Sequence, residues 1–152
     1  MSLTQHTAKH LREVFFSGNW TVTNLRDQTA DVTWQQATKK IEGFNTIAAL
    51  FYHINYYVGA ILPVLEGGKL DAHDKYSWAH PPIESEEDWQ NLRAAAFSKV
   101  EQLAARIEAM PDETMWTDFQ DAKYGDYYRN LHGLIEHTHF HLGQIAILKK
   151  MV

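Results

Sequence analysis

The chain contains one long apolar run, Ile47–Leu65, in which His53 and Asn55 are the only polar residues other than tyrosines. A run of this length has to be considered first as a membrane span. Its two strongly polar side chains and three tyrosines would be costly in lipid, which favours a buried helix of a bundle. Asn45 can cap the first turn and Gly67-Gly68 can end the last one. The run therefore predicts a central helix that is surrounded by other helices.

Helical periodicity recurs elsewhere in the chain, and no run shows the alternation of β-branched residues that is typical of strands. The long helices are expected at 3–16, 45–66, 85–109 and 127–150. A shorter helix should begin at Thr33-Trp34, inside the first long connection. Four long helices predict an all-α four-helix bundle that forms a single domain over 1–152. The connection 69–83 is long enough to span the bundle, so we expect an up-down-down-up order with a long crossover between the second and third helices.

The bulk composition excludes several classes of function. The net charge of −5 argues against a broad basic surface, so we expect no nucleic acid as a partner. The chain has no cysteine, which rules out disulfides, thiolate metal ligands and a cysteine nucleophile. Its first residues lack the basic and then apolar pattern of a secretory signal. We therefore expect a cytoplasmic protein that does not insert into a membrane.

The last predicted helix carries two histidines at the spacing of one helical turn. His137 and His141 lie about 40° apart around the helix axis, so both project from one face. Two imidazoles at this spacing can bind the same metal ion. Leu134, Ile145 and Leu148 share that face, which indicates that it points into the core.

A metal site needs more protein ligands than this pair, and His53 is the best third candidate. A histidine within an apolar helix must either find a hydrogen-bond partner or bind something. His53, His137 and His141 lie at comparable levels of their helices, so we predict that together they hold one divalent metal ion. Gln144, one turn further on, and Tyr57, beside His53, are candidates for contacts around the ligands.

Other histidines are poorer candidates for the same ion. His6 and His10 form a second pair one turn apart in the first helix, and with no third partner evident we interpret them as a surface pair without an assigned role. His132 and His139 fall on nearly the opposite side of the last helix from the predicted ligands. The two histidines in loops, which we expect to be solvated, are His73 and His80.

At these residues the sequence resembles the DinB-like (DinB/YfiT-type) superfamily of metal-binding four-helix bundles. The resemblance includes one histidine in the second helix, matched by His53, and a pattern close to H-x-x-x-H-R-G-Q in the last helix. That pattern is matched by His137, His141, Gly143 and Gln144. Leu142 stands where the family often has arginine, which removes any anion contact that the arginine would make. In helix layout the resemblance extends over nearly the whole chain.

Three neutral imidazoles suit zinc or nickel, with manganese or iron as alternatives. They leave at least one position for a small-molecule substrate, as catalytic sites do. Hydrolysis normally needs a base beside the metal, but Thr138 follows the first ligand of the pair and Glu136 projects about 100° from the ligand face. The resemblance implies a metal-dependent transferase or isomerase that uses a low-molecular-weight thiol. We therefore favour thiol transfer, with a hydrolase or a non-catalytic metal- or small-ligand-binding bundle as alternatives.

The last helix also has a second apolar strip, which bears on assembly. The strip consists of Leu131, Ile135, Leu142 and Ala146. A bundle helix needs only one buried stripe, so a second stripe often marks a partner. The alternative is that the strip packs against the short helix near Trp34. We favour a homodimer, since closed two-fold pairs are the commonest assembly.

Overall fold

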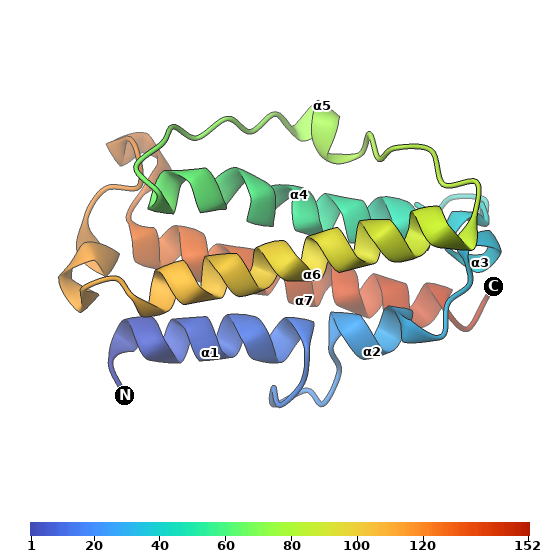
Figure 1. Cartoon of the computed structure of the whole chain (residues 1–152), viewed down its shortest axis with the longest axis horizontal. Helices are drawn as coiled ribbons and strands as arrows, with labels where there is room; N and C mark the ends of the chain where they lie inside the picture. The colour runs from blue at the N-terminus through green and yellow to red at the C-terminus, as the bar shows by residue number, and fades with distance from the viewer.

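Four long helices form the frame of the molecule. In the computed structural model, which describes residues 1–152, these are α1 (Leu3–Phe15), α4 (Ile47–Leu65), α6 (Glu86–Glu108) and α7 (Tyr127–Leu148). α1 and α4 each pack against both α6 and α7, so the four helices close around one core (Figure 1). The chain contains no β-strand, and the prediction of an all-α protein is confirmed.

The directions of the long helices follow from the colours of Figure 1. α1 and α7 run from left to right in that view, whereas α4 and α6 run from right to left. The connection between α4 and α6 passes along the length of α4 before α6 begins. α1 and α7 are therefore neighbours that run in parallel, which determines the residues that face each other between them.

The connections hold short helices, some of which the sequence did not predict. These elements are α2 (Leu25–Ala30), α3 (Trp34–Thr38), α5 (Asp74–Ser77) and the 3-10 helices η1 (Asp112–Trp116) and η2 (Ala122–Tyr124). α3 begins where its cap predicted, because the Thr33 and Gln36 side chains bond reciprocally to each other's backbone N–H groups. α2 and α5 have only six and four residues, too few for a periodic pattern to show.

α4 is the apolar run of the sequence, with one correction at its first turn. Thr46 caps the helix instead of Asn45, because the Thr46 hydroxyl accepts a hydrogen bond from the backbone N–H of Ala49 at 3.1 Å. Gly67 follows the helix end with φ of +86°, a conformation that glycine adopts without strain. By length and composition alone α4 could cross a membrane, but it packs between α6 and α7 in this structure.

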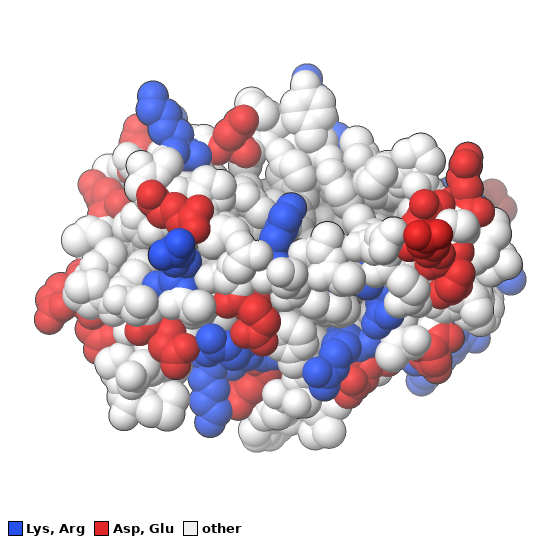
Figure 2. Space-filling view, in the orientation of Figure 1, with Lys and Arg blue, Asp and Glu red and all other residues white.

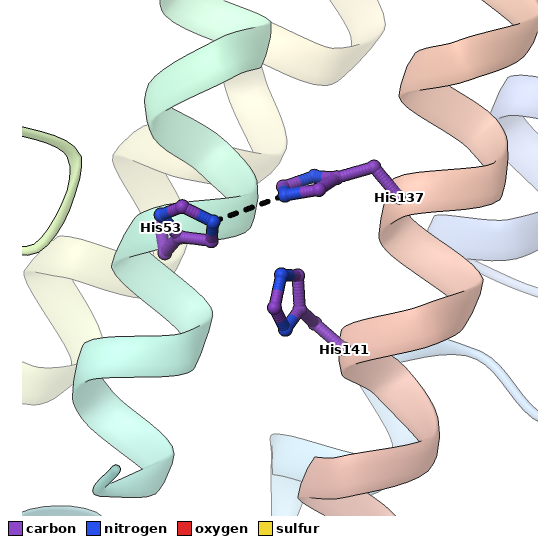
Figure 3. A group of neighbouring side chains, drawn as sticks. All are labelled: His53, His137 and His141. Atoms are coloured by element: carbon purple, nitrogen blue, oxygen red, sulfur yellow. Dashed lines mark hydrogen bonds between the residues drawn. The ribbon is translucent and has the colours of Figure 1, made fainter. Parts of the chain in front are cut away.

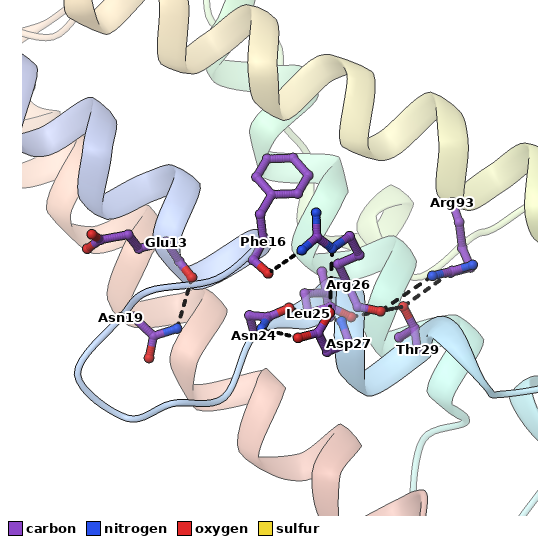
Figure 4. A network of polar contacts seen from close by, with 9 residues as sticks. All are labelled: Glu13, Phe16, Asn19, Asn24, Leu25, Arg26, Asp27, Thr29 and Arg93. Atoms are coloured by element: carbon purple, nitrogen blue, oxygen red, sulfur yellow. Dashed lines mark hydrogen bonds and ion pairs between the residues drawn. The ribbon is translucent and has the colours of Figure 1, made fainter.

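A polar network attaches α2 to its neighbours (Figure 4). Arg93 of α6 donates from Nε to the Thr29 hydroxyl at 3.1 Å and from Nη2 to the carbonyl of Arg26 at 3.4 Å. Arg26 in turn donates to the carbonyl of Phe16, the C-cap residue that directly follows α1. These bonds hold α2 in line with α1, where it also contacts α7.

α2 and the loop before it cover the second apolar strip of α7. Leu131, Ile135 and Leu142 are only 1%, 2% and 1% exposed, so the strip is part of the core. Its cover comes from α1, α2 and the 17–24 loop, and not from α3, which packs on α4 and α6. Only Ala146 is half-buried, so three of the four residues of the strip are not available to a second copy. This corrects the reasoning from sequence, and the homodimer stays an untested prediction.

The start of α1 is attached to η1 by a carboxylate. Asp112 accepts hydrogen bonds from the backbone N–H groups of Thr4 and Leu3, both at 2.9 Å. These bonds stabilise the ionised form and lower the pKa of Asp112 to about 2.

On the face drawn in Figure 2, acidic and basic side chains are interspersed, without a continuous basic patch.

Candidate metal centre

Three histidines meet halfway along the bundle, between α4 and α7 (Figure 3). His53 comes from α4, and His137 and His141 come from successive turns of α7. One nitrogen of each ring lies within 4.8 Å of the others, and the Nε2 atoms of His53 and His137 are 3.0 Å apart. His53 and His141 are 4% and 7% exposed. The structure therefore brings together the three residues that the sequence singled out, in a group that could hold a metal ion.

The orientation of His53 is set by the segment that contains α5. The Ser77 hydroxyl donates to the carbonyl of Asp74 at 2.6 Å, which leaves its oxygen to accept from His53 Nδ1 at 2.7 Å. With the proton on Nδ1, the lone pair of Nε2 faces the other two histidines. The Trp78 indole stacks on the imidazole with a centroid distance of 3.7 Å. Sequence reasoning missed Ser77 and Trp78, because the segment has no pattern that links it to His53.

The two histidines of α7 are oriented differently from each other. His141 Nδ1 donates to the side-chain oxygen of Gln144 at 2.6 Å, which leaves Nε2 as the ligand atom. This is a direct contact with the ring, of the kind expected for Gln144 from its position. His137 Nδ1 is buried and has no hydrogen-bond partner within the chain. Of the two rings on α7, only that of His141 has its outer nitrogen held by the protein.

Tyr57 packs against two of the three imidazoles. Its ring meets His53 edge to face at 5.2 Å and His137 at 5.0 Å, measured between centroids. Its hydroxyl donates to the Asp74 carboxylate at 2.8 Å. Burial and the bond to Asp74 both raise the pKa of Tyr57, so the phenol keeps its proton at neutral pH.

Two of the three histidines, His53 and His137, are neutral well below pH 7. Burial, followed by repulsion from His141, lowers the pKa of His53 to about 4. Burial, followed by repulsion from His141 and His53, likewise lowers the pKa of His137 to about 4. An imidazole binds a metal through its neutral form, so these two rings need lose no proton to do so at physiological pH.

The donor set fits a divalent ion. Tetrahedral coordination with metal–nitrogen bonds of 2.0–2.1 Å separates the ligand nitrogens by about 3.3 Å. The 3.0 Å between the Nε2 atoms of His53 and His137 is close to that separation, whereas the group as a whole spans up to 4.8 Å, so a ring has to turn inward to complete the set. With the proton of His53 on Nδ1, His137 Nε2–H donates to His53 Nε2 in the metal-free chain, and a bound cation would take the place of that proton. Three neutral nitrogen ligands also match the preference of zinc, nickel and related ions.

A cavity of about 590 Å³ borders the histidine group. Its polar and charged lining residues are His53, Tyr57, Asp74, Arg129, Asn130, Glu136 and His137. The Arg129 guanidinium makes no ion pair within the chain, so it can hold an anionic group of a ligand. Glu136 was expected to project away from the ligand face. It is exposed, but the cavity is wide enough to include Glu136 in its wall beside His137.

Comparison with known proteins agrees with this geometry. A family model described as the DinB superfamily matches residues 19–145, which include all three histidines of the group. Searches of curated proteins and of solved structures gave no match.

Proposed function

The chain belongs to the DinB superfamily, and on this premise we propose that it holds one divalent metal ion and uses it to transfer a low-molecular-weight thiol. The proposed ligands are His53, His137 and His141, with Gln144 and Tyr57 supporting them. Zinc or nickel suits three imidazoles best, and manganese or iron are alternatives. Three protein ligands leave room for a substrate atom, as in catalytic rather than structural sites.

The main support for this proposal is the position of the cavity. It borders two of the three imidazoles, so a small molecule in it would reach the ligand group directly. A divalent ion supplies acidity there, since it favours the deprotonated form of a thiol that it coordinates. Arg129 would anchor an anionic end of the substrate at the other end of the cavity, two turns before His137. The phenol of Tyr57, which is hydrogen-bonded to Asp74, would form part of the cavity wall and would restrict the access of water to the ligand group.

The proposed reaction is a nucleophilic transfer. The thiol proton passes to Glu136 or to solvent, the sulfur forms a bond to an electrophilic carbon of the acceptor, and the leaving group departs with its electron pair. No side chain needs to act as the nucleophile, which agrees with the absence of cysteine from the chain. The residues of the cavity bind and orient the substrate, and one of them accepts its proton.

A metal-dependent hydrolase is the second candidate, and one observation favours it. Glu136 lies in the cavity wall beside His137, where a carboxylate could remove a proton from water. Against it, Glu136 is exposed and no hydrogen bond holds its carboxylate. A bundle that binds a metal or a small ligand without turnover is the third possibility.

Cobalt-loaded protein provides the test. Addition of a small thiol such as mercaptoethanol should produce a sulfur-to-cobalt charge-transfer absorption, and His53→Ala should abolish it. The zinc- or nickel-loaded protein should then couple the thiol to an electrophilic chromophore at a rate that depends on the metal. Hydrolysis of an ester without any thiol turnover would instead establish the second candidate. A loaded protein that does neither, but loses melting temperature when the metal is removed, would indicate a structural ion.

A further inference from the structure

A second group of histidines lies where α1 packs against α7. His6 and His10 are one turn apart on α1, and His132 stands opposite on α7, with its Nε2 atom 3.5 Å from the Thr7 hydroxyl. All three line one hollow of about 350 Å³ that is open to solvent. The sequence offered no third partner for the His6–His10 pair. The parallel packing of α1 and α7 supplies one.

This group repeats the helical spacing of the metal centre, although its ligand nitrogens are not gathered within 4.8 Å of one another as those of the metal centre are. There, α7 provides two histidines one turn apart and α4 provides the third; here α1 provides the pair and α7 the third. We infer that His6, His10 and His132 bind a second divalent ion of the late transition series, such as zinc, nickel or copper. Nothing in the proposed thiol transfer requires this ion.

The charges around the hollow are compatible with a cation. Burial, followed by repulsion from His10, lowers the pKa of His132, which favours the neutral ring. Lys9 also lines the hollow, but its ammonium is paired with the Glu13 carboxylate at 3.6 Å. Glu13 lines the hollow as well, so the fixed charges of the wall cancel.

The two groups differ in how closely their rings already converge. His6 is exposed and must give up rotamer freedom to bind, and His10 is only partly buried. The His132 ring packs against Tyr128 at a centroid distance of 4.2 Å, which holds one of the three in place. The second ion should therefore bind more weakly than the first. Once bound, it would connect α1 directly to α7.

Zinc titration of the full chain without a histidine tag tests the inference. By calorimetry, and by elemental analysis after equilibrium dialysis, the wild-type protein should bind two equivalents, one tight and one weaker. His10→Ala and His6→Ala should each leave only the tight equivalent, whereas His53→Ala should leave only the weaker one. The matched control is His73→Ala, which removes an exposed loop histidine and should keep both.

Two results would overturn the second site. One is a wild-type protein that binds a single equivalent, which His53→Ala then abolishes; this outcome leaves the proposed metal centre intact. The other is a second equivalent that persists in both His10→Ala and His6→Ala. Circular dichroism checks that each variant keeps its helices. The melting temperature adds an independent readout, since excess zinc should raise it further in the wild type than in His10→Ala.

Discussion

Two histidine groups with the same ligand spacing lie on opposite sides of α7, and their surroundings differ. On the side of α4 the rings are mostly buried, and hydrogen bonds that Ser77 and Gln144 accept fix the outer nitrogens of two of them. On the side of α1 the hollow is open, His6 is exposed, and His132 and His10 are held by ring contacts with Tyr128 and His139. Ligand spacing alone therefore does not distinguish the two groups. Their supporting contacts do.

The difference shows what a preorganised site requires. Residues that orient a ligand contribute to metal affinity without touching the metal, because they remove the cost of arranging the ring at binding. In the α4 group much of this support comes from the connection that contains α5. At the α1 group the only connection residue beside the hollow is Trp20, which is 96% exposed and packs on none of the three rings.

The largest effect should come from removing a ligand on the α4 side. His53→Ala should weaken the tight metal equivalent by at least about 100-fold, since loss of a ligand costs no less than loss of a supporting residue. His139→Ala is the matched control, because His139 lies between the two ligands of α7 in sequence but packs against His10 of α1. Dialysis followed by elemental analysis measures both. Equal losses in the two variants would contradict the assignment of ligands.

A smaller effect is expected from removing a residue that orients a ligand but does not itself bind the metal. Ser77→Ala removes the acceptor of His53 Nδ1 and should weaken the tight equivalent by about 10- to 100-fold, while the weaker equivalent is unchanged. The control is Ser98→Ala, which removes a serine hydroxyl on the exposed side of α6 and should change the affinity of neither equivalent. If Ser77→Ala binds metal as tightly as the wild type, the orientation of His53 does not depend on this contact, and the comparison of the two sides fails.

The smallest effect is a pH dependence of the metal-free protein. The pKa of His53 and of His137 is about 4 in the folded chain but about 6.5 when unfolded, so the unfolded state binds more protons between these values. Their contribution to stability is therefore complete above pH 6.5 and is lost progressively as the pH falls towards 4. Urea denaturation at pH 7 and pH 5 should show the lower stability at pH 5.

A double variant makes this measurement specific. His53→Gln with His137→Gln should flatten the profile, leaving the smaller contribution in the same direction from His132 and His139, whose pKa values are also lowered. Asp112 does not interfere, because its pKa of about 2 places its titration below this range. A double variant that loses as much stability as the wild type between pH 7 and pH 5 would show that the two rings are not buried in neutral form.

The ligand group could be predicted from the sequence because its signals are local. The turn spacing of His137 and His141, and the isolation of His53 within an apolar helix, follow from helix geometry and from the cost of burying a polar group. The second apolar strip was also visible, but its covering was not. α2 has six residues, and a polar network docks it instead of a periodic apolar face.

Ser77 and Trp78 could not be predicted for a different reason. They lie 24 and 25 residues from His53 in an irregular connection, and their proximity depends on the path of that connection along α4. Likewise, the third histidine beside His6 and His10 becomes evident only when α1 and α7 are known to be parallel neighbours. Both features are set by tertiary packing, which single-helix patterns do not encode.

The stacking of Trp78 on His53 has an optical consequence. The Trp78 indole stacks directly on the ring that an ion at this site would polarise, so its excited state feels a change in that ring. The ultraviolet emission of this tryptophan should therefore report occupancy: a paramagnetic ion such as nickel or cobalt would quench it, and zinc would shift it. Of the other four tryptophans, Trp20 and Trp116 are 96% and 61% exposed and give a red-shifted background that a soluble quencher can remove. The emission of Trp34 and of the buried Trp89 is measured in a Trp78→Phe variant and subtracted. The chain thus carries a fluorophore beside its candidate metal centre, and no dye has to be attached.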